Sequence, residues 1–89
     1  MNDLVQATPT PVSARACLAM NLIRLRRERG WSQESLALEA GLHRTFVAHV
    51  ERQVRNISLD NVERLAATFG LEAWQLLRRP ASAMAHYSP

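Results

Sequence analysis

The stretch 29-RGWSQESLALEAGLHRTFVAHVE-51 contains two short helical patterns separated by a glycine. Ser32 is suited to cap the first of these helices, which the apolar spacing predicts over residues 33–39. Gly41 ends that helix, and a second helix is predicted to begin near His43. Two short helices joined by a tight glycine turn are typical of the helix-turn-helix unit. The stretch therefore predicts such a unit.

Three more helices are predicted outside this stretch, one before it and two after it. Residues 14–29 have leucines that recur about one helical turn apart, at Leu18, Leu22 and Leu25. Ser58 caps a pattern that runs to Phe69, and residues 72–78 form a last short helix, which Pro80 ends.

A chain of 89 residues allows one domain. Leucine and alanine dominate, while β-branched and aromatic residues are few, which favours an all-α fold. We therefore expect one five-helix domain over residues 14–79. Residues 1–13 and 80–89 contain prolines and small polar residues without periodicity, so they are interpreted as a flexible arm and a flexible tail.

The basic residues are concentrated in the first half of the chain. The net charge is +3, and every basic side chain is an arginine, apart from the three histidines. Eight arginines and four glutamates lie between Arg15 and Arg55, whereas three arginines and three acids follow Asn56. A basic half-domain indicates a polyanionic partner, most often nucleic acid. The alternative is an ordinary solvated basic face.

Several other classes of function are not supported by the sequence. Cys17 is the only cysteine, so no disulfide framework is expected, and a reducing cytoplasm is indicated. His43 and His49 point to different sides of a helix, which gives no metal site, and no catalytic pattern or cofactor motif is present. No apolar run is long enough to span a bilayer, and the stretch MNDLVQATPTP lacks the features of an export signal. We expect a cytoplasmic protein that is not an enzyme and needs no cofactor.

The predicted helix from His43 to Glu51 has two different faces. At ~100° per residue, one face collects Arg44, Thr45, Ala48, His49 and Arg52. The opposite face collects Phe46, Val47 and Val50. A helix in the DNA major groove requires an apolar face that packs on the rest of the domain. It also requires an outer face with hydrogen-bond donors around a small residue.

Three residues of the outer face are predicted to read bases. Arg44 lies at the start of the helix, where its fork can bind guanine O6 and N7 together. Its alternative role is a phosphate contact. Thr45 can meet a thymine methyl group or a phosphate, or can simply start the helix. His49 meets a base or a phosphate, or remains a solvated surface residue. His43 lies at the helix start and toward the core side, so it is interpreted as structural.

The same residues carry a resemblance to a known family. The step Ser32-Gln33, the pair Ala40-Gly41 and Glu51 resemble the marks of the phage-repressor-like DNA-binding domains, the Cro and lambda repressor or XRE family. This likeness covers residues 18–77. His43-Arg44-Thr45, followed by Glu51-Arg52 and Arg55-Asn56, is more similar to the controller proteins of restriction–modification systems. The resemblance implies a compact lambda-repressor-like domain in a bacterial or phage transcription regulator that is associated with the nucleoid. The likeness to controller proteins also implies autoregulation, in which the protein binds the promoter of its own gene.

A second group of residues is predicted to contact phosphates. The resemblance implies this role for Gln33, whose backbone amide lies at a helix start and whose side chain can also donate. Arg52, Arg55 and Asn56 follow the second helix of the unit, where the chain would run beside the DNA backbone. The alternative is a solvated basic loop. The resemblance also implies a structural ion pair between Arg26 and Glu51.

Specific binding by so small a domain normally needs two copies on two half-sites. We therefore expect a homodimer on a palindromic operator in double-stranded DNA, with no small-molecule ligand. The predicted interface consists of Ile57, Asn61, Phe69, Trp74 and Leu77. The alternative is that Trp74 and Leu77 only complete the monomer core. Two other functions remain open: an antitoxin that represses its own operon, and a protein-interaction module without DNA binding.

Overall fold

The computed structural model describes residues 12–54 and 56–80, and these residues form five helices and no strand. The helices in chain order are α2 (Ala14–Glu28), α3 (Gln33–Ala40), α4 (Arg44–Glu51), α5 (Leu59–Thr68) and α6 (Ala73–Leu77). The predicted all-α architecture is confirmed, and the predicted helix ends differ from the observed ones by no more than one residue. None of the helices in the described part of the chain has the length and apolar character needed to cross a membrane.

Serine side chains begin three of the helices. The hydroxyls of Ser13, Ser32 and Ser58 accept hydrogen bonds from the backbone N–H groups of Ala16, Ser35 and Asn61 at 3.0–3.1 Å. Each bond satisfies an N–H that has no partner inside its helix. Ser13 therefore belongs to the folded domain, although the sequence analysis placed it in the arm.

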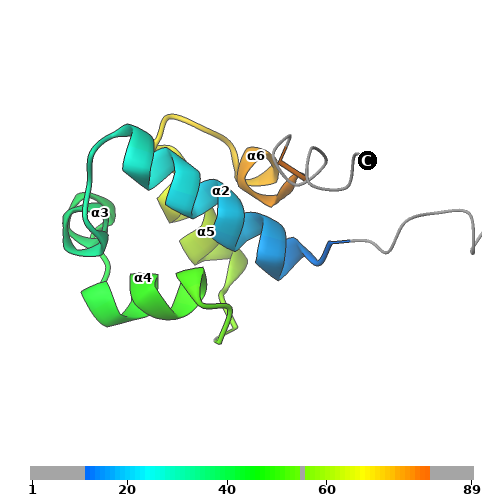
Figure 1. The fold of residues 1–89 in the computed structure, drawn as a ribbon, viewed down its shortest axis with the longest axis horizontal. Helices are drawn as coiled ribbons and strands as arrows, with labels where there is room; N and C mark the ends of the chain where they lie inside the picture. The colour runs from blue at the N-terminus through cyan, green and yellow to red at the C-terminus, as the bar shows by residue number, and fades with distance from the viewer. Residues whose placement is uncertain (1–11, 55, 81–89) are drawn as a thin grey trace, which may run out of the picture.

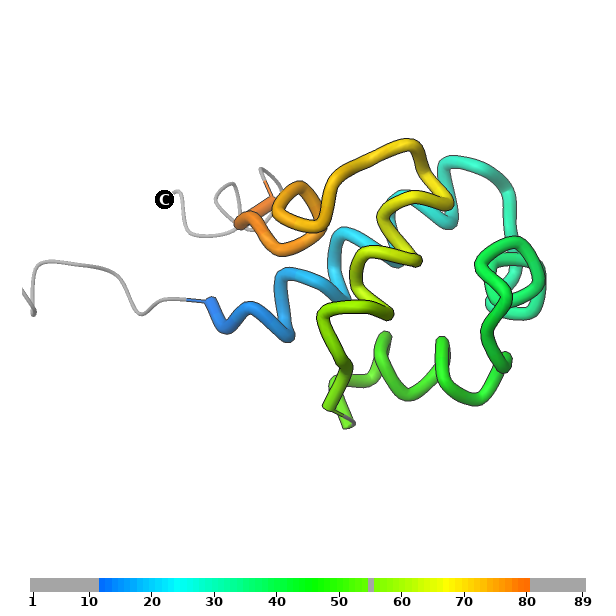
Figure 2. The backbone as a smooth tube through the Cα atoms, turned by 180° about the vertical axis from the view of Figure 1, so that it is seen from behind, coloured from blue at the N-terminus to red at the C-terminus, as the bar shows by residue number. Residues whose placement is uncertain are grey.

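The helices pack around one core. Figure 1 shows α4 along one edge of the molecule, α3 at one end, and α2 crossing above α4. Figure 2 shows from the other side how α5 continues through a loop into α6. The residues that are almost inaccessible to solvent come from all five helices, and the largest of them are Leu18, Leu22, Leu36, Val47, Val50, Leu65 and Leu76.

A buried asparagine attaches α6 to α2. Asn21 is 2% exposed, and its Nδ2 donates to the carbonyl oxygens of Leu76 at 2.7 Å and Arg78 at 2.9 Å. Carbonyl groups at a helix end have no N–H partner within the helix, so the Asn21 amide supplies the hydrogen-bond donors that the end of α6 lacks. A helix of five residues is too short to be stable alone, and α6 therefore depends on this attachment.

Phe69 differs from its predicted role in the dimer interface. Its side chain is only 7% exposed within the monomer, and its ring centroid lies 5.6 Å from that of Trp31. The Arg29 guanidinium lies over both rings, at 5.2 and 5.3 Å from the centroids. Phe69, the C-cap residue of α5, thus packs within the monomer core and leaves little surface for a subunit contact.

The predictions for the two ends of the chain cannot be compared with the structure in full. Most of the predicted arm and tail, residues 1–11 and 81–89, lies outside the described residues. Pro80, predicted as the first residue of the tail, is buried. The folded domain therefore extends slightly further at both ends than residues 14–79.

Candidate nucleic-acid interface

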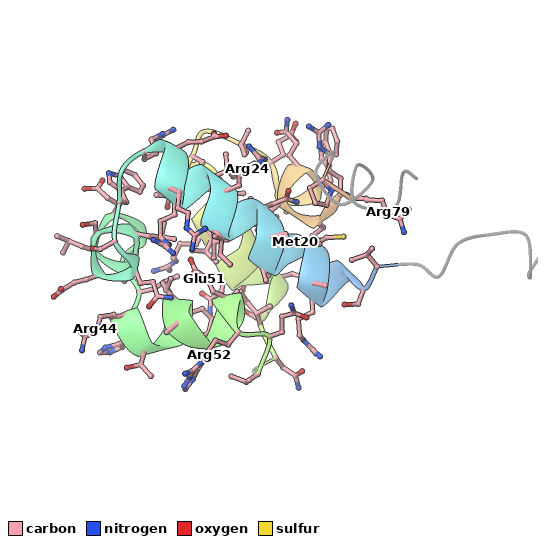
Figure 3. The ribbon with its side chains drawn as sticks, viewed as in Figure 1. Met20, Arg24, Arg44, Glu51, Arg52 and Arg79 are labelled. Atoms are coloured by element: carbon pink, nitrogen blue, oxygen red, sulfur yellow. The ribbon has the colours of Figure 1, made fainter. Side chains whose placement is uncertain are left out.

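The two faces of α4 are separated in the structure as they are in the sequence pattern. Val47 and Val50 are 0% and 1% exposed and hold the helix against the core. Arg44, Thr45 and Arg52 are exposed, and Figure 3 shows both arginines on the outer edge of α4, pointing away from the body of the molecule. His49 is half-buried, so it is less available than the other three residues.

His43 lies outside the core, contrary to the sequence analysis. It is the N-cap residue of α4, its side chain makes no capping hydrogen bond, and it is exposed. Its backbone is extended, with φ −77° and ψ 144°, so the helical face on which it was placed does not apply to it. Together with Thr45, it borders a shallow hollow next to Leu42 and Phe46.

A buried carboxylate joins the three helices behind this surface. Glu51, whose side chain is 4% exposed, accepts from Arg26 Nε at 2.7 Å and from Arg26 Nη2 at 3.1 Å. Arg26 Nη1 also donates to the backbone oxygen of Trp31 at 2.9 Å. This two-pronged contact fixes the guanidinium plane, so α4 is held to α2 in one orientation.

Gln33 is part of the same network. Its Nε2 donates to Glu51 Oε1 at 2.8 Å, which links the first residue of α3 to the last residue of α4. From the sequence, both its side chain and its backbone N–H are predicted to contact a phosphate. Because the side chain already serves Glu51, the backbone N–H at the start of α3 is the better placed of the two groups.

The loop after α4 brings together residues that are far apart in the sequence. Arg52 and Asn56 are exposed, whereas Arg55 lies outside the described residues. Asn56 Oδ1 accepts from Arg15 Nη2 at 2.7 Å, a contact that spans 41 positions of the chain. In the sequence, Arg15 contributes only to the charge balance, because no periodicity connects the start of α2 with this loop.

Next to this contact lies an open apolar groove of about 310 Å³. Arg15 and Asn56 form its polar rim. Its apolar lining consists of Ala14, Leu18, Ile57, Leu59, Val62 and Leu77. Leu59, which lines the groove from α5, is 73% exposed, and Trp74, on the same helix as Leu77, is 57% exposed.

Two further features of the described residues concern metal and thiol chemistry. No group of three or more histidine, cysteine or acidic residues in this part of the chain could hold a metal ion. Cys17 is buried and free. The notable polar features are thus the arginine-rich outer face of α4 and the loop that follows it.

Residues 22–73 match the family described as helix-turn-helix. The match includes α3, α4 and the turn between them, and it covers more than half of the chain. This chain belongs to the helix-turn-helix family, in its Cro and lambda repressor (XRE) branch.

Individual proteins that are similar to this chain indicate a more specific group within the family. A hypothetical transcription factor from Neisseria meningitidis serogroup B is 49% identical over 72 residues, which are 81% of this chain and 68% of that protein. Control protein C.BamHI from Bacillus amyloliquefaciens is 48% identical over 46 residues, 52% of this chain and 57% of that protein. The crystal structure of the restriction–modification controller protein C.AhdI from Aeromonas hydrophila has a TM-score of 0.65 and is 40% identical, covering 70% of this chain and 94% of that chain. The predicted resemblance to controller proteins is confirmed.

The family determines the broad function of this helix-turn-helix protein. Its members are DNA-binding transcription regulators, and the family is not one of enzymes. The outer face of α4 is therefore the candidate DNA interface.

Proposed function

We propose that this protein is a sequence-specific transcription regulator that binds a palindromic operator as a homodimer and acts in the cytoplasm of a bacterium or of a phage host. The observation that carries the proposal is the division of α4 into a buried apolar face and an exposed face with Arg44, Thr45 and Arg52. A helix held in this way presents its donors on a rigid support, which is what reading a base edge requires.

Base reading is assigned to Arg44, Thr45 and His49. Arg44 is the first residue of α4 and is exposed, so its guanidinium can reach the O6 and N7 atoms of a guanine. Thr45, beside it, offers a methyl group to thymine. His49 is one turn further along and half-buried, so we assign it the smallest share of the discrimination.

Phosphate binding is assigned to groups on both sides of this reading surface. The backbone N–H of Gln33 lies at the start of α3, where the helix dipole favours an anion. Arg52, Arg55 and Asn56 follow α4 and would track the sugar–phosphate backbone. Such contacts hold the protein on DNA of any sequence and set its register on the operator.

The homodimer is assigned to the apolar groove and the side chains around it. Ile57, Asn61 and Leu77 are half-buried in the monomer, and Trp74 is exposed, so these four predicted interface residues remain available. Leu59 joins them, because it lines the groove and is 73% exposed. A second copy with the same groove and the same exposed side chains would cover these surfaces by two-fold symmetry.

Autoregulation is the mode of control that the likeness to controller proteins favours. The first DNA to be assayed is therefore the promoter of the protein's own gene, where an inverted repeat would supply two half-sites. A complete absence of DNA binding there and on genomic fragments would favour the protein-interaction module instead. Leu38, which is 79% exposed on α3, would then be the first surface residue to probe.

The proposed division between base-reading and phosphate-binding residues is tested by comparing two arginine variants. Arg44→Ala should weaken binding to the operator by about 1–3 kcal/mol and leave binding to mixed-sequence DNA nearly unchanged. Arg52→Ala should weaken both by a similar factor and flatten the dependence of log K on log salt by about 0.9. Both constants are measured by fluorescence anisotropy over a range of salt concentrations.

The two variants control for each other, since each removes one exposed arginine from α4 or its end. If Arg44→Ala and Arg52→Ala lower operator and mixed-sequence affinity to the same extent, Arg44 is a phosphate contact and the proposed division is wrong. If the unmodified protein prefers no sequence at all, the proposed function itself fails.

A further inference from the structure

Arg15 forms a polar pair with Asn56, and Arg15 has no part in the DNA contacts proposed so far. Arg15 lies in the first turn of α2, and Asn56 lies in the loop between α4 and α5. Both are exposed, and the Nη2 of Arg15 donates to the Oδ1 of Asn56 at 2.7 Å. The contact fixes one end of the loop that follows the candidate reading helix.

The chemistry of this bond determines which way the Asn56 amide faces. A guanidinium has only donors, so the asparagine must turn its oxygen toward Arg15. Its amide nitrogen, with two N–H groups, therefore points away from the arginine. The hydrogen-bonding capacity that the pair still offers to solvent consists mainly of N–H donors and one positive charge, which is suited to an anionic oxygen.

The charge of Arg15 is not matched by a carboxylate. Among the residues that the structure describes, two salt bridges are present, Arg24–Glu28 and Arg26–Glu51, and neither includes Arg15. Arg24 lies on the same helix but is paired with Glu28 at 3.2 Å. Arg15 and Arg24, both exposed on α2, thus differ in whether a neighbouring acid already neutralises them.

The position of the pair relates it to the candidate DNA surface. Asn56 follows Arg52 in the same loop, at the end of α4 that is opposite to Arg44. Figure 1 shows this loop next to the start of α2, below which α4 forms the outer edge, whereas Figure 3 shows Arg24 on the other side of α2. The hydrogen bond to Asn56 therefore places the Arg15 guanidinium beside the loop that follows α4.

We propose that Arg15 is a phosphate-binding residue of the DNA interface, which also orients the amide of Asn56 toward the same nucleic acid strand. This inference rests on the proposed function. It adds a helix to the phosphate-binding surface, because α2 then contributes a contact beside those of α3 and of the loop after α4. Two donors held by each other lose less side-chain freedom on binding than two independent ones.

Salt titration of DNA binding tests this proposal. Arg15→Ala should reduce the slope of log K against log salt by about 0.9, the value for one phosphate contact, on operator and mixed-sequence duplexes alike. Arg15→Lys keeps the charge and should retain most of the slope, although it cannot present the planar fork to Asn56. Arg24→Ala is the matched control, because it removes an exposed arginine from the same helix and should leave the slope unchanged.

Asn56→Asp tests the orientation of the amide. The carboxylate can still accept from Arg15, but it replaces the outward N–H groups with negative charge, so binding should weaken more than in Asn56→Ala. Both residues are exposed, so the variants should fold, and a circular dichroism melt of each one checks this.

Three results would overturn the inference. One is an unchanged slope in Arg15→Ala, and another is an equal loss of slope in Arg24→Ala, which would indicate a general effect of charge. The third is a weaker homodimer with an unchanged slope, measured by sedimentation, which would place the pair at the subunit contact instead. Failure of the proposed function is recognised separately, since the unmodified protein would then show no preference for its operator over mixed-sequence DNA.

Discussion

At the scale of single residues, Glu51 has the greatest effect on how the DNA-facing helix is held. Its nearly buried carboxylate accepts from Arg26 and from Gln33. Glu51→Ala leaves the Arg26 guanidinium, which is 13% exposed, without its counter-charge. We expect the free energy of unfolding to fall by about 3–5 kcal/mol, the usual loss when one partner of a buried pair is removed. Urea denaturation followed by circular dichroism measures the loss.

Arg24→Ala is the control for this prediction. It breaks the Arg24–Glu28 pair, whose side chains are 46% and 59% exposed, and an exposed pair one helical turn apart contributes about 0.3–0.5 kcal/mol. A comparable loss in Glu51→Ala and Arg24→Ala would show that the buried network has no special part in stability. The large difference that we expect follows from solvent screening, which weakens the outer pair and not the inner one.

At the scale of elements, the end of α4 is unusual among the helices. Gly30, Gly41 and Gly70 follow α2, α3 and α5 with φ values of 69°, 71° and 70°. After α4 the same left-handed turn is made by Gln53, with φ 62°, and its N–H bonds to the Val50 oxygen at 3.1 Å. A side chain is strained in this region, whereas glycine adopts it freely.

Gln53→Gly should therefore stabilise the protein. We expect a gain of about 1 kcal/mol in the free energy of unfolding, since relief of the left-handed strain exceeds the extra chain entropy of glycine in the unfolded state. Gln53→Ala keeps the Cβ atom and should bring no gain. The midpoints of urea denaturation distinguish the variants, and equal midpoints for Gly and Ala would mean that strain at Gln53 is negligible.

At the scale of the whole molecule, we expect a dimer because apolar surface is exposed on α5 and α6. Sedimentation equilibrium at micromolar concentration should show a dimer for the unmodified protein. Trp74→Ala, which removes a large side chain that is 57% exposed, should shift the equilibrium toward monomer by at least tenfold. Leu38→Ala removes an apolar residue that is 79% exposed on α3 and should leave the dimer unchanged.

A monomeric unmodified protein at this concentration would contradict the homodimer. It would support the alternative that Trp74 and Leu77 complete the core of one chain. Equal effects of Trp74→Ala and Leu38→Ala would instead indicate nonspecific association through apolar surface. The location of Leu38 on α3, away from the groove, is what makes it a useful control.

Much of this molecule could be predicted from local sequence because its helices are defined by local interactions. Serines at helix starts and glycines at helix ends act within a few residues, so the five helices were found with small errors at their ends. The placement of Arg44 and Thr45 on the outer face of α4, and of Val47 and Val50 on its buried face, likewise follows from helical geometry alone. His43 was misplaced because a cap residue with an extended backbone does not share the periodicity of the helix that it precedes.

The sequence by itself thus determined the fold class, the helix-turn-helix unit and the outer face of α4. Only the tertiary structure decided that Phe69 packs against Trp31 and Arg29, that the Gln33 side chain serves Glu51, and that Arg15 meets Asn56. These three facts depend on how whole helices pack against one another. Helical periodicity specifies the direction of a side chain around its own axis, but which distant residue it meets depends on the arrangement of all five helices in the core.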